Sequence, residues 1–95
     1  MHKCINQSIG NVYHLEQMVD NFFPYSQKQL QFDKPVEIIF QSDDGNANKM
    51  LGKTAFYDPE NMQVVLFVDK RHPKDVLRSL SHELVHHAQN CRGDL

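Results

Sequence analysis

The sequence lacks most of the features that would assign the chain to a specialised class. Two cysteines, Cys4 and Cys91, are too few for a disulfide framework, and we expect both to be reduced thiols. No apolar run approaches the length of a membrane span, which excludes a membrane partner of that kind. The first ten residues, MHKCINQSIG, contain no continuous apolar stretch of a secretory signal, so we expect a cytoplasmic protein.

An excess of charge of one sign is also missing. Ten Lys and Arg stand against twelve Asp and Glu, which gives a formal net charge of -2. The basic residues are scattered along the chain, so there is no electrostatic case for a nucleic-acid partner. The remaining composition, 95 residues with 40% hydrophobic and 23% charged, is typical of one globular domain, residues 1–95, with a single core.

The first predicted element is an amphipathic helix. Apolar residues recur at intervals of three and four positions, which is the spacing of one helix face: Ile5, Ile9, Val12, Leu15, Val19 and Phe22. We expect this helix to end before Pro24, because proline removes a backbone donor and restricts the residue that precedes it.

Short β-rich segments follow in the middle of the chain. Residues 35–41 alternate as a strand with one buried side, and residues 42–52 are rich in turn formers and predict a loop. Within that loop, DDGN at 43–46 indicates a turn rather than a calcium site, because the later ligands do not follow. Residues 53–57 and 63–69 are joined by a turn sequence and predict a hairpin.

The last predicted element is a helix with clear signals at both ends. Pro73 and Asp75 suit its first turn, and Gly93 suits a stop just after Arg92. The predicted order is therefore α-β-β-β-α. It indicates an α+β domain in which a small three-stranded sheet packs against an N-terminal and a C-terminal helix.

The chemistry of the chain is concentrated in this last helix, at SLSHELVHHAQ, residues 79–89. At about 100° per residue, His86 lies about 40° and Glu83 about 100° around the helix from His82. The apolar residues gather on the other side: Leu77, Leu80, Leu84, Ala88 and Cys91. Two imidazoles one turn apart can both reach a single Zn²⁺ ion, so we expect His82 and His86 to be accessible metal ligands.

The motif His82-Glu83-Leu84-Val85-His86, with a hairpin before it, resembles the HExxH signature of the zincin metallopeptidases over roughly residues 36–92. It is most similar to small gluzincin-like proteins of bacteria and their phages. The resemblance implies zinc held by His82 and His86, with Glu83 as the general base for a zinc-activated water. It also implies a peptide or protein substrate, which we expect to align along the strand at 63–69.

The sequence does not identify the third zinc ligand directly. Metzincins continue as HExxHxxGxxH, but Gln89 and Arg92 occupy those positions here. Gluzincins use a glutamate on a later helix, and the only carboxylate after Glu83 is Asp94, which is therefore the candidate ligand. Weaker candidates are Glu60, His72 and His87, the last of which we expect to form hydrogen bonds at the core margin.

Two interpretations remain open at this point. In one, the chain is a zinc-dependent metallopeptidase, or a fragment of one that lacks a C-terminal subdomain supplying the ligand. In the other, it is a catalytically inactive zincin-like structural or assembly protein that binds other protein chains, such as a phage particle component.

Overall fold

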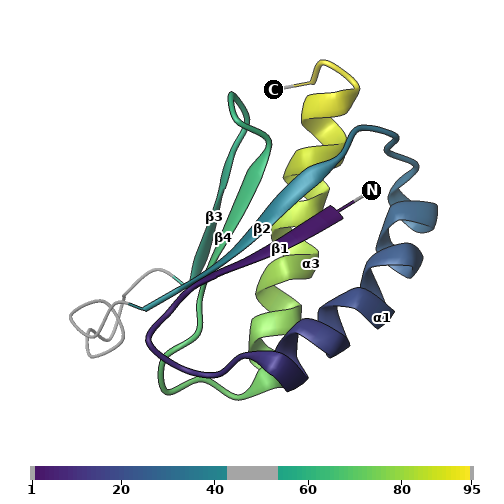
Figure 1. Ribbon diagram of the computed structural model, residues 1–95. Helices are drawn as coiled ribbons and strands as arrows, with labels where there is room; N and C mark the ends of the chain where they lie inside the picture. Colours follow the sequence, from purple (N-terminus) through teal and green to yellow (C-terminus); the bar gives the residue numbers. More distant parts are fainter. Residues whose placement is uncertain (1, 43–53, 95) are drawn as a thin grey trace.

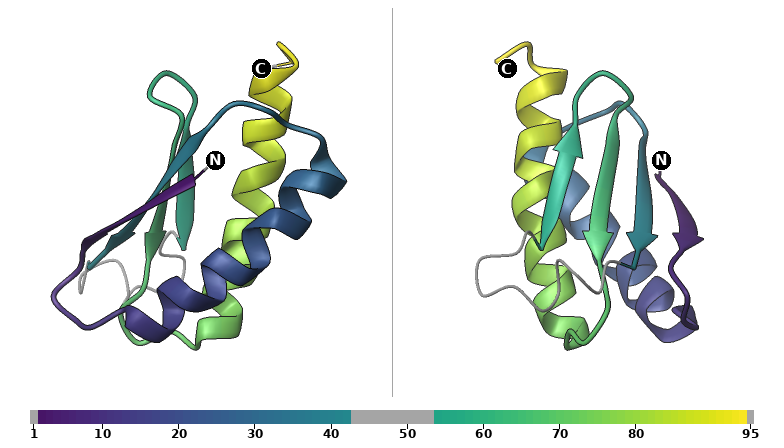
Figure 2. Two further views of the ribbon diagram at one scale, coloured as in Figure 1. Left: turned by 45° about the vertical axis from the view of Figure 1, so that its right-hand side comes forward. Right: turned by 90° about the vertical axis from the view of Figure 1, so that its left-hand side faces the viewer.

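The computed structural model describes residues 2–42 and 54–94, so the turn expected at 43–46 lies outside the described residues. The elements in chain order are β1 (His2–Gln7), α1 (Tyr13–Leu30), β2 (Val36–Gln41), β3 (Ala55–Asp58), β4 (Gln63–Phe67) and α3 (Pro73–Cys91). The strands form one mixed sheet, and both helices cover the same face of it (Figures 1 and 2). The α+β class is confirmed.

The sheet has the strand order β1-β2-β4-β3. β1 and β4 each pair with β2 in parallel, whereas β3 pairs with β4 antiparallel, as expected of the predicted hairpin. The prediction of three strands is wrong, because the chain forms a fourth strand before its first helix.

That fourth strand, β1, corrects the N-terminal prediction. Ile5 lies in β1 opposite Ile39 of β2, and Ile9 lies outside the helix with 85% of its surface exposed. Six residues of β1 pair with β2, and α1 provides the crossover that a parallel pair requires. The turn formers between Gln7 and Val12 separate the strand from the helix.

The predicted stop before Pro24 is also wrong, because α1 continues through this residue to Leu30. Pro24 is exposed, and the carbonyl that loses its helical donor belongs to Asp20, which is also exposed. Water can therefore satisfy this carbonyl. Continuing the helix brings Ser26 into a buried position and leads to Phe32, which is 4% exposed.

The core lies between the sheet and the two helices. It contains the alternate residues of β2 and β4 that face the helices, one side of each helix, and one residue on either flank of α1: Val12, Leu15, Val19, Phe23, Phe32, Val36, Ile38, Phe40, Val64, Leu66, Val76, Leu80, Leu84 and Ala88. Within the described ranges, neither helix is long and apolar enough to cross a membrane.

Strand β4 cannot align a substrate by strand addition as expected of residues 63–69. β4 is paired on both sides, with β2 and with β3, so the prediction that 63–69 offers a free edge is wrong. Val64, Val65 and Leu66 are all buried, and an apolar strand of this kind is favoured in the interior of a sheet. The edges of the sheet are β1 and β3.

Candidate metal site on helix α3

Helix α3 begins as the sequence predicts. Pro73 stands at its start, Asp75 lies in its first turn, and the His72 ring accepts a hydrogen bond from the backbone N–H of Lys74. Gly93, with φ of 80°, adopts the left-handed conformation that commonly follows a helix end. His72 therefore serves as the helix cap through its Nδ1.

The helix separates a core side from a polar side, as the angular analysis predicts. Leu80 and Leu84 are fully buried and Ala88 is 1% exposed, whereas His82 and His86 are exposed. Leu77 is half-buried against the same core. The two imidazoles therefore face away from the sheet, and the helix that carries them is fixed by its apolar side.

Hydrogen bonds show which side of α3 adjoins the edge strand β3. Near one end of the strand, Arg71 donates to Ser79 Oγ at 2.8 Å and to the carbonyl of Thr54 at 3.1 Å. Near the other end, the Asn90 amide donates to Tyr57 Oη at 3.0 Å and to the carbonyl of Pro59 at 3.1 Å. Ser79 and Asn90 therefore mark the β3 side of the helix.

Glu83 lies on that same side. Taking His82 as zero, Ser79 lies at about 60°, Asn90 at about 80° and Glu83 at about 100° around the helix. Glu83 is half-buried and has no hydrogen-bond or ion-pair partner among the residues that the structure describes. The carboxylate is thus available next to the sheet edge, with the two histidines on its solvent side.

The imidazole of His86 is oriented by a neighbour on the next turn. Its Nδ1 lies 3.2 Å from Oε1 of Gln89. An amide oxygen can only accept, so this contact favours the tautomer in which Nδ1 carries the proton and Nε2 is free to bind a metal. Gln89, which breaks the metzincin pattern, therefore takes the orienting position that metal-binding histidines usually require.

The structure does not bring Asp94 to the two histidines. Its carboxylate accepts a hydrogen bond from Arg92 Nε at 3.1 Å, and its backbone N–H donates to the carbonyl of Gln89. Across residues 2–42 and 54–94, no third His, Cys, Asp or Glu forms a compact ligand group with His82 and His86. Glu60 lies in the turn between β3 and β4.

His87 forms hydrogen bonds, as expected, but it is fully buried rather than at the margin of the core. Its Nε2 lies 2.9 Å from the carbonyl of Lys34, and its Nδ1 lies 2.6 Å from Tyr57 Oη. Burial lowers the pKa of His87 below its usual 6.5, which keeps the ring neutral. The neutral ring therefore donates to Lys34 through Nε2 and accepts from the Tyr57 hydroxyl through Nδ1.

A second group of side chains of metal-ligand type lies outside the HExxH motif. His2, Cys4 and Asp20 place one ligand atom each within 4.8 Å of one another. Two of these residues lie on a strand that the apolar pattern failed to predict, and Asp20 lies on the helix beside it. Their alternation on β1 could have indicated a shared face, but nothing in the sequence pairs them with Asp20.

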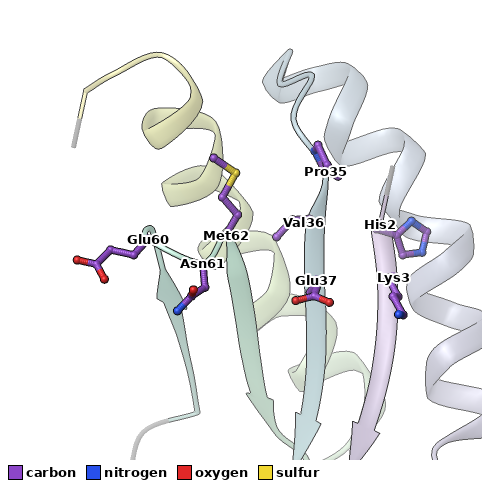
Figure 3. Close-up of a pocket in the computed structure, with 8 residues that line it drawn as sticks. All are labelled: His2, Lys3, Pro35, Val36, Glu37, Glu60, Asn61 and Met62. Atoms are coloured by element: carbon purple, nitrogen blue, oxygen red, sulfur yellow. The ribbon is translucent and has the colours of Figure 1, made fainter.

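One pocket among the described residues lies away from the motif. A pocket of about 540 Å³ is lined by residues of β1, the start of β2 and the β3–β4 turn, and none of them belongs to α3. Figure 3 shows Lys3 and Glu37 on neighbouring strands there, with the His2 ring turned towards α1. The residues of the motif therefore lie on an exposed helix face outside this pocket.

No family model, curated protein or solved structure matches the chain.

Proposed function

We propose that the chain is a zinc-dependent metallopeptidase of the HExxH type, with a minimal zincin-like, gluzincin-like fold. One observation carries this proposal. His82 and His86 are exposed and Glu83 is half-buried on a helix that is anchored by its apolar side, and the helical spacing puts Glu83 on the side where Ser79 and Asn90 adjoin the edge strand β3. A helix without a function in solvent would have no need for this combination of ligands, base and adjoining strand.

The donor set fits zinc as far as the described residues extend. Four residues of helix rise by about 6 Å, which places two imidazoles on one side within reach of a common ion. Gln89 supports His86 in the tautomer that offers Nε2. Asp94 remains our proposed third ligand, and it would have to exchange its contact with Arg92 for the metal. A zinc ion held there supplies Lewis acidity and lowers the pKa of water towards neutrality.

Residues of the chain supply proton transfer and substrate alignment. The carboxylate of Glu83 accepts a proton from the attacking water and delivers it to the amine that leaves. Strand β3 takes the substrate-aligning role expected of 63–69, because it is an edge strand and adjoins the Glu83 side of α3. An extended peptide that adds to this edge would pass the base, which favours peptides and unfolded segments as substrates.

Substitution of Glu83 provides the central test. Glu83→Gln keeps the size and hydrogen-bonding reach of the side chain but cannot act as a base, so chelator-sensitive cleavage of an unstructured protein should fall by a factor of about 100 or more. Asp33→Asn, which makes the same carboxylate-to-amide change at an exposed position between α1 and β2, is the matched control and should leave cleavage unchanged. Cleavage that persists in Glu83→Gln would contradict the proposed base.

A second function is favoured by the position of Asp94. With His82 and His86 as the only protein ligands among the described residues, zinc would be held weakly, and a catalytically inactive zincin-like structural or assembly protein, such as a phage particle component, would fit such a site. Asp94→Ala separates the two proposals. A tenfold or larger loss of zinc affinity, with an unchanged circular dichroism spectrum, supports the enzyme. Unchanged affinity together with an absence of cleavage supports the assembly role.

A further inference from the structure

The edge strand β1 and helix α1 face each other through polar side chains. His2 and Cys4 are two positions apart in β1 and so point to the same side of the sheet, the side that α1 covers. Asp20 reaches them from the helix: its Oδ1 lies 2.6 Å from His2 Nε2 and 3.8 Å from Cys4 Sγ. Three different donor types therefore converge from two elements.

We propose that His2, Cys4 and Asp20 bind a zinc-class divalent cation, at a site separate from α3. A thiolate, an imidazole and a carboxylate are ligands that Zn²⁺ and Co²⁺ accept together, whereas Mg²⁺ and Ca²⁺ select oxygen. This assignment uses no residue of the HExxH motif and does not rest on the proposed function.

The distances require little rearrangement. In a tetrahedral site with zinc–ligand bonds of about 2.0–2.3 Å, ligand atoms stand about 3.3–3.8 Å apart. The contact between Cys4 and Asp20 already has this length, the hydrogen-bonded His2–Asp20 pair must open by roughly 0.7 Å, and the ligand atoms of His2 and Cys4 lie within 4.8 Å of each other. The Asp20 side chain is 52% exposed and can move, whereas the His2 ring is stacked on Phe23 with a centroid separation of 4.2 Å.

The charge around the cluster also favours a cation. Burial, the charges of Asp20 and Glu16 and the hydrogen bond to Asp20 raise the pKa of the Cys4 thiol to about 12. Glu16 lies four residues before Asp20 and therefore on the same side of α1. The two carboxylates that disfavour a second negative charge attract a divalent cation, and the cation in turn stabilises the thiolate.

Cobalt is the appropriate probe because a thiolate bound to Co²⁺ produces a charge-transfer absorption band in the near ultraviolet. We would use the His82→Ala, His86→Ala double variant, which removes the candidate ligands on α3. Titration should give one Co²⁺ per chain with this band, and added Zn²⁺ should abolish it. No band at saturating Co²⁺ would overturn the proposal.

Cysteine variants in the same background identify the sulfur. Cys4→Ser should eliminate the band, and Cys91→Ser, the matched control on α3, should retain it. The opposite result, a band that survives Cys4→Ser or disappears in Cys91→Ser, would place the metal elsewhere and overturn the assignment.

The role of the Asp20 carboxylate is tested by the affinity for Co²⁺ rather than by the absorption band. Asp20→Asn preserves shape at an exposed position and should weaken Co²⁺ binding at least tenfold, with an unchanged far-ultraviolet circular dichroism spectrum. Equal affinity in Asp20→Asn and its parent would show that Asp20 only accepts hydrogen bonds, and would refute the three-residue site.

Discussion

Replacement of His87 by Phe tests whether the buried polar network, rather than ring packing alone, fixes α3 against β3. His87 is fully buried and lies between the carbonyl of Lys34 and the hydroxyl of Tyr57. Phenylalanine keeps the edge-to-face ring contacts with Phe32 and Tyr57 but supplies neither donor nor acceptor. The carbonyl of Lys34 and the hydroxyl proton of Tyr57 then lose the partners they have in the native protein.

An orphaned buried group costs about 1–3 kcal/mol, and because Lys34 is exposed and Tyr57 is half-buried, we expect a total loss of about 2–3 kcal/mol in the free energy of unfolding. The matched variant Tyr57→Phe should cost less, about 1–2 kcal/mol, because Asn90 keeps its bond to the carbonyl of Pro59.

Urea unfolding followed by circular dichroism, in the presence of a chelator, measures both variants and their combination. The double variant should lose less free energy of unfolding than the two single variants together, because each single variant already removes the hydrogen bond between Tyr57 and His87. An unchanged or higher urea midpoint for His87→Phe would refute the reasoning and show that the polar contacts contribute nothing net.

Two further predictions concern the same helix. Leu80→Ala and Leu84→Ala should each lower the free energy of unfolding by about 2–5 kcal/mol. Leu77→Ala should lower it by clearly less, because Leu77 is only half-buried, and equal losses in urea unfolding would contradict this order. Burial lowers the pKa of His87 in the folded protein below 6.5, its usual value in the unfolded chain. The neutral ring therefore contributes fully to the free energy of unfolding above about pH 6.5, and this contribution is lost as the pH falls below that value. Unfolding at pH 7.5 and 5.5, with chelator, should show a smaller acid-dependent loss for His87→Phe than for the parent.

Helix α3 and the hairpin could be predicted because their signals are local. The apolar residues of α3 recur with the helical period, Pro73 and Gly93 mark its ends, and the turn between β3 and β4 is closed by Asp58, whose side chain accepts from the backbone N–H of Glu60. The exposure of His82 and His86 follows from the same period. Each of these features depends only on residues close in sequence.

Strand β1 and the neighbours of β4 could not be predicted, because they depend on pairing between distant segments. A single apolar residue at Ile5 fits a helical spacing with Val12 as well as it fits a strand, and only the six-residue pairing with β2 decides between them. Likewise, the sequence shows that Val64, Val65 and Leu66 are apolar but not which strand lies on either side. The group of His2, Cys4 and Asp20 was missed for the same reason.

The separation of the two sides of α3 decides how the functional tests can be interpreted. Substitutions at His82, Glu83 and His86 act on exposed or half-buried side chains, and none of these three contributes to the buried core. Substitutions at exposed helix positions usually change stability by less than about 0.5 kcal/mol, whereas loss of a core leucine changes it by several. A large loss of metal binding or cleavage in Glu83→Gln or His86→Ala, with an unchanged urea midpoint, therefore reports on the site itself. If these variants instead unfolded like Leu84→Ala, the polar side would be structural, and the proposal of a metallopeptidase would lose its basis.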